Sequence, residues 1–291
     1  MLRLTLIAAA IVIASLWGMR AKREYLKRSW QNAINHYDRS TLLAFSQNDA
    51  IDVNDHLPGG PSALTRAAQA GDVELIKVLL VHHADVNVRT REGRTPLHFA
   101  AEKGNAQSAK SLIEHGAQVD ATADNGVTPL LAACAVGNCQ TASVLLDHGA
   151  KVDSRTNYGI TPLYFAAQGG NEATVQLLLE KGADPNPSRG EYNTYVITAA
   201  SSYSGTIGGI RKPTPGMVKD LLSHGAKIGL YEAALIGDLS RVKNLITQYK
   251  KDGRLSTDGP NALGAARSRG YAQVVEALAA AGVKSEASGR D

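Results

Sequence analysis

Apolar residues recur along most of this chain with a period of 33 residues. Pairs of leucine or isoleucine stand at positions 79–80, 112–113, 145–146 and 178–179, each near the end of a stretch whose apolar positions have helical spacing. A fixed period between about 20 and 50 residues indicates stacked supersecondary units. The pattern therefore predicts an array of similar helical units.

Each unit carries signals for two short helices and a turn. Threonine followed by proline predicts the start of the first helix, because threonine caps the helix and proline loses no hydrogen bond at the first helical position. A glycine predicts its end, and the leucine pair of the second helix is expected to face inward. A turn such as Asn-Gly then predicts a projecting hairpin. The starts are Thr95, Thr128 and Thr161, and the ends are Gly104, Gly137 and Gly170.

The units become irregular towards both ends of the chain. Residues 193–226 form a unit with ten extra residues, placed near 204–214 between its two helices. Residues 230–246 form a unit without a hairpin, since only three residues separate it from the unit before. Residues 261–283 and 33–54 are degenerate units. Atypical terminal units are expected where a stack meets water.

The sequence Thr-Pro-Leu-His at 95–98, the alanine pair, Gly-Asn, the leucine pair, Gly-Ala and Asp-Val-Asn resemble, in this order, the consensus of the ankyrin repeat family. The match runs from about Pro61 to Asn186, and we interpret the chain as a membrane-anchored member of bacterial type. The resemblance implies an all-α solenoid of helix pairs with β-turn fingers, which binds proteins through its fingers and inner helices. It also implies that His98 hydrogen-bonds near Thr95.

The predicted organisation has four regions. Residues 1–28 form a membrane anchor with a basic flank, and residues 29–58 a degenerate N-terminal cap. Residues 59–284 form the ankyrin repeat array with its insertion near 204–214, and residues 285–291 a flexible tail.

The anchor prediction rests on the stretch from Leu4 to Met19, in which only Thr5 and Ser15 are polar. A helix of this length spans roughly 24 Å, somewhat less than a hydrocarbon core of about 30 Å. Trp17 and the basic residues that follow can extend it at the interface. We predict one uncleaved N-terminal transmembrane or signal-anchor helix. A cleaved signal peptide is the alternative, although no small-x-small cleavage site follows the apolar stretch. The basic flank favours a cytoplasmic body, and export of the body is the alternative.

Composition and charge indicate what kind of core the chain forms and which partners it favours. Aromatic residues make up 5% of the chain against 44% hydrophobic residues, so small aliphatic side chains must form the core. The net charge is +4, but residues 1–28 hold six basic residues against Glu24 alone, which leaves −1 for the remainder. A body without basic excess gives no indication of a nucleic-acid partner, and we expect none.

No spacing of residues predicts catalysis or metal binding. Histidines end several second helices, where they suit the helix dipole, and repeats about 10 Å apart cannot bring them to a common zinc ion at roughly 2 Å. Cys134 takes a small packing position, and a disulfide with Cys139 is the alternative. The glycine-rich stretch at 205–213 lacks the Gly-Lys-Ser/Thr of a phosphate loop. We predict no enzyme activity, no cofactor and no metal.

Positions that neither cap nor pack form a candidate partner-binding surface. By their phase in the repeat nine of them lie on the fingers and the adjoining first helices, and they change from basic through acidic-polar to apolar-aromatic along the array. The tenth, Tyr203, belongs to the loop of the insertion, where an apolar side chain can contact a partner. Aromatic and arginine side chains are frequent anchors of protein interfaces. The candidates are Arg91, Arg94, Lys103, Asp124, Val127, Tyr158, Ile160, Gln168, Tyr192 and Tyr203.

The sequence thus predicts a non-enzymatic module that docks a partner protein on the concave ankyrin face at a membrane. One alternative is an immunity or inhibitor protein that neutralises a toxin or enzyme at the membrane. Another is an accessory scaffold subunit of a membrane-associated enzyme.

Overall fold

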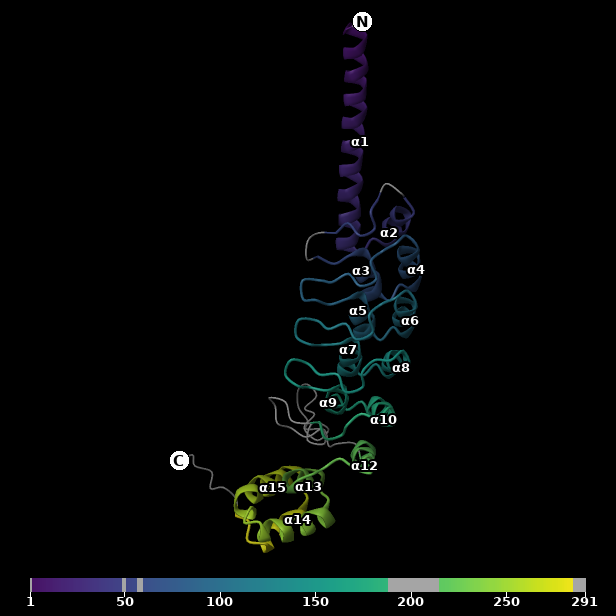
Figure 1. The fold of residues 1–291 in the computed structure, drawn as a ribbon. Helices are drawn as coiled ribbons and strands as arrows, with labels where there is room; N and C mark the ends of the chain where they lie inside the picture. The colour runs from purple at the N-terminus through teal and green to yellow at the C-terminus, as the bar shows by residue number, and fades with distance from the viewer. Residues whose placement is uncertain (1, 49–50, 57–59, 188–214, 285–291) are drawn as a thin grey trace, which may run out of the picture. The chain divides into compact units, whose positions relative to one another are not determined.

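The computed structural model describes residues 2–48, 51–56, 60–187 and 215–284, and the side chains of residues 2–18 and Pro215 lie outside this description. All regular secondary structure in these ranges is helical (Figure 1). The helices are α1 (Leu2–His36), α2 (Arg39–Ser46), α3 (Ala63–Ala70), α4 (Val73–Val81), α5 (Pro96–Lys103), α6 (Ala106–Glu114), α7 (Pro129–Val136), α8 (Cys139–Asp147), α9 (Pro162–Gln168), α10 (Glu172–Glu180), α12 (Pro215–Ser223), α13 (Leu230–Ile236), α14 (Leu239–Lys251), α15 (Leu255–Arg269) and α16 (Ala272–Ala280).

The chain divides into two compact units, residues 1–133 with 140–150 and residues 134–139 with 151–291. In the first unit α3 packs against α5 and α4 packs against α6, so first helices form one layer and second helices another. In the second unit α13 packs against α15 and α14 against α16 in the same way. The helix pairs therefore stack like with like within each unit, which fits the predicted ankyrin-type architecture.

The first helices begin and end as their sequence predicts. Thr95 caps α5 in an extended conformation, Pro96 occupies the first turn, and His98 completes a capping box with Thr95. Gly104 ends the helix with φ of 72°, a left-handed conformation that costs glycine little. α9 begins in the same way at Thr161, whose hydroxyl oxygen accepts a hydrogen bond from the backbone N–H of Tyr164.

The second helices bury one member of the leucine pair more completely than the other. Leu145 is fully buried, whereas Leu146 keeps partial exposure. Leu112 and Ile113 differ in the same way. Neighbouring helical positions point about 100° apart, so only the first member faces the first-helix layer directly. The prediction that both members are inward-facing is confirmed for Leu79 with Leu80 and for Leu178 with Leu179, whereas Ile113 and Leu146 are only partly buried.

Asparagine side chains join consecutive repeats. Nδ2 of Asn87 donates a hydrogen bond to the carbonyl oxygen of Gly116 at 3.1 Å, and Oδ1 of Asn87 accepts one from the backbone N–H of Gln118 at 2.8 Å. Asn54 joins the preceding repeat by the same two bonds. Each amide therefore satisfies one carbonyl at a helix end and one N–H of the next loop.

An equivalent asparagine contact spans the repeat with the predicted insertion, in the second unit. Asn186 Nδ2 donates to the carbonyl oxygen of Gly225 at 2.9 Å, and Asn186 Oδ1 accepts from the N–H of Lys227. The two residues of the first bond are 39 positions apart, against 29 for Asn87 and its partner. The difference of ten equals the number of extra residues that the sequence predicts in this repeat. Residues 204–214 themselves lie outside the described part.

The segment predicted as anchor and basic flank shares one helix, α1, with the start of the predicted cap (Figure 1). Trp30 in α1 is fully buried, and its Nε1 donates a hydrogen bond to the carbonyl oxygen of Asp55 at 3.0 Å. The ammonium group of Lys27 lies 2.9 Å from the carboxylate of Asp55. These contacts hold the C-terminal part of α1 against the rest of the first unit.

Among the residues that the structure describes, no helix is long and apolar enough to cross a membrane. The apolar stretch from Leu4 to Met19 falls almost wholly on positions whose side chains lie outside the description. The anchor therefore stays a prediction from the sequence.

A polar network joins the degenerate N-terminal unit to the next repeat. The Arg39 guanidinium pairs with the carboxylates of Asp72 and Glu74, and Tyr37 donates a hydrogen bond to Asp72 at 3.1 Å. Burial and the negative charge of Asp72 raise the pKa of Tyr37 to about 12. Burial also opposes ionisation of Asp72, but hydrogen bonds from Arg39, the N–H of Leu75 and Tyr37 outweigh it and hold the pKa of Asp72 below its usual range.

Helices α13 to α16 form a C-terminal block with its own core. The buried side chains include Leu230, Val242, Leu263 and Leu278. α14 and α15 have 13 and 15 residues, against eight and nine in α5 and α6. α15 begins at Leu255, earlier than the predicted start of the last unit near residue 261. The extra helical turns occupy the stretch where a regular repeat has its finger.

Candidate functional site

The fingers of the regular repeats share one hydrogen-bonded turn. In the first unit the N–H of Thr90 donates to the carbonyl oxygen of Arg94 at 2.9 Å, and the N–H of Gly93 donates to that of Thr90 at 2.9 Å. The same two bonds recur 33 residues later between Ala123, Gly126 and Val127. Gly93 and Gly126 have φ of 73° and 78°, so glycine relieves the strain of the left-handed turn. The predicted hairpin fingers are confirmed in these repeats.

The basic binding candidates of the first unit differ in their contacts with neighbouring side chains and in their exposure. The Arg94 guanidinium lies 4.1 Å from the centre of the Phe99 ring and pairs with Glu102, which leaves 28% of the Arg94 side chain exposed. Arg91 at the finger tip and Lys103 at the end of α5 are exposed. The finger and the end of α5 therefore present one braced cation and two exposed ones.

The next finger is held from two sides. The backbone N–H of Asp124 donates to the carbonyl oxygen of Glu92 at 3.1 Å, so one finger rests on the other while the Asp124 side chain stays exposed. The carbonyl oxygen of Val127 accepts a hydrogen bond from Nε2 of His98 at 3.0 Å. Val127 is half-buried, so it offers less surface to a partner than the sequence predicted.

His98 couples a helix start to the following finger. Its Nδ1 accepts from the backbone N–H of Thr95 at 3.1 Å, which confirms the expected contact, while Nε2 reaches Val127. Both bonds together require the neutral tautomer that carries its proton on Nε2. Burial lowers the pKa of His98 to about 4.

The finger of the second unit presents an aromatic side chain. Tyr158 is 51% exposed, Ile160 is half-buried, and Gln168 is exposed at the end of α9. The N–H groups of Tyr158 and Ile160 both donate to the hydroxyl oxygen of Thr156, at 3.3 and 3.2 Å. Backbone bonds of Thr156 to Ile160 and Gly159 close the turn. The finger thus holds an exposed ring on a rigid support.

Two of the predicted binding residues, Tyr192 and Tyr203, lie outside the described part of the chain. Of the others, the structure brings Arg91 and Arg94 onto one finger with Asp124 on the finger that it contacts. Tyr158 and Ile160 share a finger in the second unit.

The histidines at second-helix ends have the structural role that the sequence predicts. Nδ1 of His115 donates to the carbonyl oxygen of Ser111 at 2.8 Å, and Nδ1 of His148 donates to that of Val144 at 2.7 Å. Each ring thus satisfies a carbonyl in the last turn of its helix. No group of three or more His, Cys, Asp or Glu within the described ranges could hold a metal ion.

The two cysteines are free thiols, so the disulfide alternative is not what the structure shows. Cys134 is fully buried, as predicted for a small packing residue, and burial raises the pKa of its thiol far above the usual range. A buried protonated thiol is a poor nucleophile.

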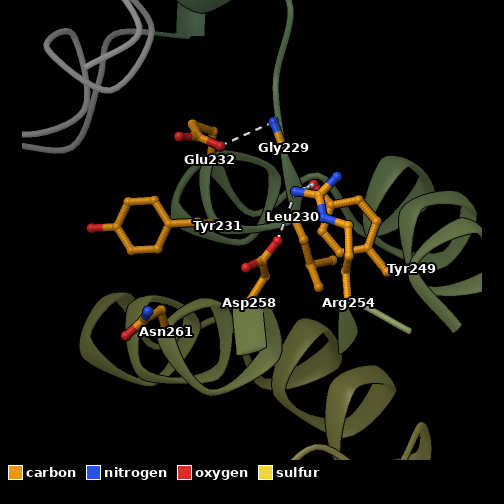
Figure 2. Close-up of a pocket in the computed structure, with 8 residues that line it drawn as sticks. All are labelled: Gly229, Leu230, Tyr231, Glu232, Tyr249, Arg254, Asp258 and Asn261. Carbon is orange, nitrogen blue, oxygen red and sulfur yellow. Dashed lines mark hydrogen bonds and ion pairs between the residues drawn. The ribbon is translucent and has the colours of Figure 1, made fainter. Parts of the chain in front are cut away.

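A cavity in the C-terminal block was not predicted from the sequence. It has a volume of about 460 Å³ and opens where α13, α15 and the end of α14 meet (Figure 2). The sequence features that could have pointed to it are the missing finger before α13 and two tyrosines near charged residues. Which of these residues line a common cavity depends on how the helices pack. The lining is Gly229, Leu230, Tyr231, Glu232, Tyr249, Arg254, Asp258 and Asn261.

Comparison with protein-family models matches ankyrin repeats (3 copies) to residues 31–123 and 119–189. These ranges cover more than half of the chain, so the protein belongs to the ankyrin repeat family. Ankyrin repeats are generally protein–protein interaction modules and typically have no enzymatic role. The matched range includes the degenerate N-terminal unit and ends before the C-terminal block. No curated protein matches the sequence.

Proposed function

We propose that this protein is a non-enzymatic adaptor that docks a partner protein on its fingers and the adjoining first helices. The observation that carries the proposal is the exposure of Tyr158, at 51%, on a finger whose turn is closed by backbone and threonine hydrogen bonds. The exposed half of the ring is available to a partner, and a tyrosine buries a large apolar surface with a small loss of conformational entropy. Tyr158 is therefore suited to anchor an interface.

The basic finger supports a second kind of contact. Arg94 is braced by Phe99 and Glu102, so it keeps a planar donor group in one orientation. Exposed Arg91 and Lys103 add charge that steers an approaching partner with complementary acidic groups. The adaptor would thus combine an aromatic anchor with charged contacts that select orientation.

We further propose that the partner is met at a membrane and that the body faces the cytoplasm. The support comes from the sequence, in which the apolar stretch from Leu4 to Met19 is followed by five basic residues before residue 29. Replacing Ile11 and Ile13 together by lysine should move the full-length protein from the membrane pellet to the supernatant after alkaline extraction. A double variant that stays in the pellet would contradict the anchor.

Site-specific crosslinking tests the docking surface directly. A photoreactive phenylalanine analogue in place of Tyr158 should crosslink the partner in cells. The same analogue in place of Val81, which is 68% exposed at the end of the second helix α4, should not. Equal crosslinking at both positions would place binding elsewhere.

The crosslinked products also separate the alternatives. One stoichiometric partner whose activity falls in the complex supports the inhibitor role, and several subunits of one membrane assembly support the scaffold role. Tyr158→Ala should weaken binding of the identified partner by about 1–3 kcal/mol, the range of interface hot spots.

A further inference from the structure

The cavity of the C-terminal block has a lining with excess negative charge. Among its residues Glu232 and Asp258 carry carboxylates, and Arg254 carries the one positive charge. Glu232 is 9% exposed and accepts a hydrogen bond from the backbone N–H of Gly229 at 2.9 Å. Two carboxylates against one guanidinium make the lining better suited to a cationic ligand than to an anionic one.

Aromatic and amide groups complete the wall. Tyr231 is 36% exposed, although it lies within the cavity lining, and Asn261 stands on the neighbouring helix α15. In Figure 2 the Asp258 carboxyl group is drawn between the Tyr231 ring on one side and the Arg254–Tyr249 pair on the other. The π face of a tyrosine attracts cations, and the amide oxygen of asparagine accepts hydrogen bonds.

The chain already uses this chemistry for one of its own side chains. The Arg254 guanidinium lies 4.3 Å from the centre of the Tyr249 ring, and its Nη2 is 2.8 Å from Oδ2 of Asp258. Oδ1 of Asp258 accepts a hydrogen bond from the Thr257 hydroxyl at 3.2 Å. The Asp258 side chain keeps 38% of its surface exposed, so its carboxylate oxygens, each of which can accept two hydrogen bonds, retain room for a further donor. Stacking on tyrosine and pairing with this carboxylate are therefore geometrically possible for a guanidinium here.

We infer that the cavity receives an arginine side chain of the partner protein, stacked on Tyr231 and paired with Asp258. Arginine suits the site better than lysine, because a planar guanidinium stacks on an aromatic ring and donates two parallel hydrogen bonds to a carboxylate. The inference rests on the proposed docking function and adds a contact made by residues that belong to no finger. The cavity of about 460 Å³ is large enough for one such side chain with water around it.

Titration of the full-length protein in a neutral detergent with N-acetyl-arginine amide tests the inference without the partner. Methyl NMR signals of Leu230, which lines the cavity, report on occupancy. We expect saturable shifts with a Kd on the order of 1–10 mM, typical of one ion pair and one ring contact. N-acetyl-citrulline amide, which has the same shape without the charge, should leave these signals in place.

Variants connect the signal to the site. Tyr231→Ala should weaken binding about fivefold, the share expected of an exposed cation–π contact. Tyr25→Ala removes a tyrosine that is 69% exposed on α1 and serves as the matched control, with unchanged binding expected. Tyr231 is exposed enough for its removal to leave the fold intact, and the dispersion of the other methyl signals checks this.

Three results would overturn the inference. They are the absence of saturable shifts, equal shifts with the citrulline probe, and shifts caused by inorganic phosphate in place of the arginine probe. Crosslinking at position 158 is measured separately. A crosslinked partner together with a silent cavity would therefore refute the arginine site alone, and an occupied cavity without crosslinking would refute the finger surface alone.

Discussion

The regular repeats and the C-terminal block fill the same helical position with different residues. The third residue of α5 is His98 and the third residue of α13 is Glu232, and each accepts a hydrogen bond from the N–H of its N-cap residue, at 3.1 and 2.9 Å. His98 has a second nitrogen, which donates to Val127 on the following finger. No finger lies between α14 and α15, where a carboxylate that only accepts is sufficient. The presence of the finger thus determines which residue suits the helix start.

The two regions also differ in the segments that connect their helices. Regular repeats use short helices and polar bonds such as those of Asn87, and their fingers project side chains into solvent. The C-terminal block lengthens its helices, buries Tyr249 and leaves a cavity in place of a finger. One region offers projecting side chains to a partner, and the other offers a recess.

Removing a buried leucine should have the largest effect on stability. Leu145→Ala should lower the free energy of unfolding by about 2–5 kcal/mol, because the side chain is fully buried and leaves a void. Leu146→Ala, at the partly exposed neighbouring position, should cost about 1 kcal/mol or less. Urea unfolding followed by circular dichroism measures both, and equal losses would show that the helix is rotated from the orientation described.

Acid should weaken the regular repeats through His98. Its pKa is about 4 in the folded protein against an ordinary value of 6.5, so the unfolded chain takes up the proton first as the pH falls. Titration of His98 leaves the free energy of unfolding unchanged above about pH 6.5 and lowers it as the pH falls towards about 4. The free energy of unfolding should fall by about 2 kcal/mol between about pH 7 and pH 5.

The matched variant for this test is His98→Gln, which can still accept from the N-cap but does not titrate. Its free energy of unfolding should fall by about 2 kcal/mol less than that of the wild type over the same pH interval. Parallel pH profiles for the two proteins would mean that His98 is not held neutral by burial.

Breaking one link between repeats should have a smaller effect. Asn87→Ala removes two hydrogen bonds and should cost about 1 kcal/mol. Asn244→Ala, on the exposed side of α14 in the C-terminal block, should change stability by less than about 0.5 kcal/mol. Thermal or urea unfolding of both variants measures the two losses. Equal losses would show that the hydrogen bonds of Asn87 add nothing to the stability of the regular repeats.

The smallest effect on stability is expected at the proposed binding surface. Tyr158→Ala should change the free energy of unfolding by less than about 0.5 kcal/mol, because half of the side chain is already in water. A loss of several kcal/mol would show that the ring supports the fold, and would remove the argument that it is kept for a partner.

Much of the repeat could be predicted because its signals are local. Thr95, Pro96 and Gly104 specify a helix start and end through backbone conformation and hydrogen bonding within a few residues. The phase of 33 residues then predicted the stacked helix pairs and the hairpin turns, and the ten-residue offset at Asn186. The finger positions of Arg91 and Tyr158 follow from the same phase.

Contacts between repeats could not be predicted in this way. The orientation of Leu146 depends on how the helix is rotated against its neighbours, and the partial burial of Val127 depends on where His98 reaches. Neither leaves a signal in a short stretch of sequence. The cavity beside Tyr231 is a stronger case, because its lining comes from three helices whose spacing is set by packing.

The sequence by itself determined the family, the period and the ends of the regular helices, because caps, prolines and left-handed glycines act on the backbone beside them. Only the tertiary structure decided which exposed groups are braced, as Arg94 is by Phe99, and which are gathered into one cavity, as Tyr231 and Asp258 are. Side chains distant in sequence meet only when helices pack, and packing depends on the shapes of all neighbouring side chains at once.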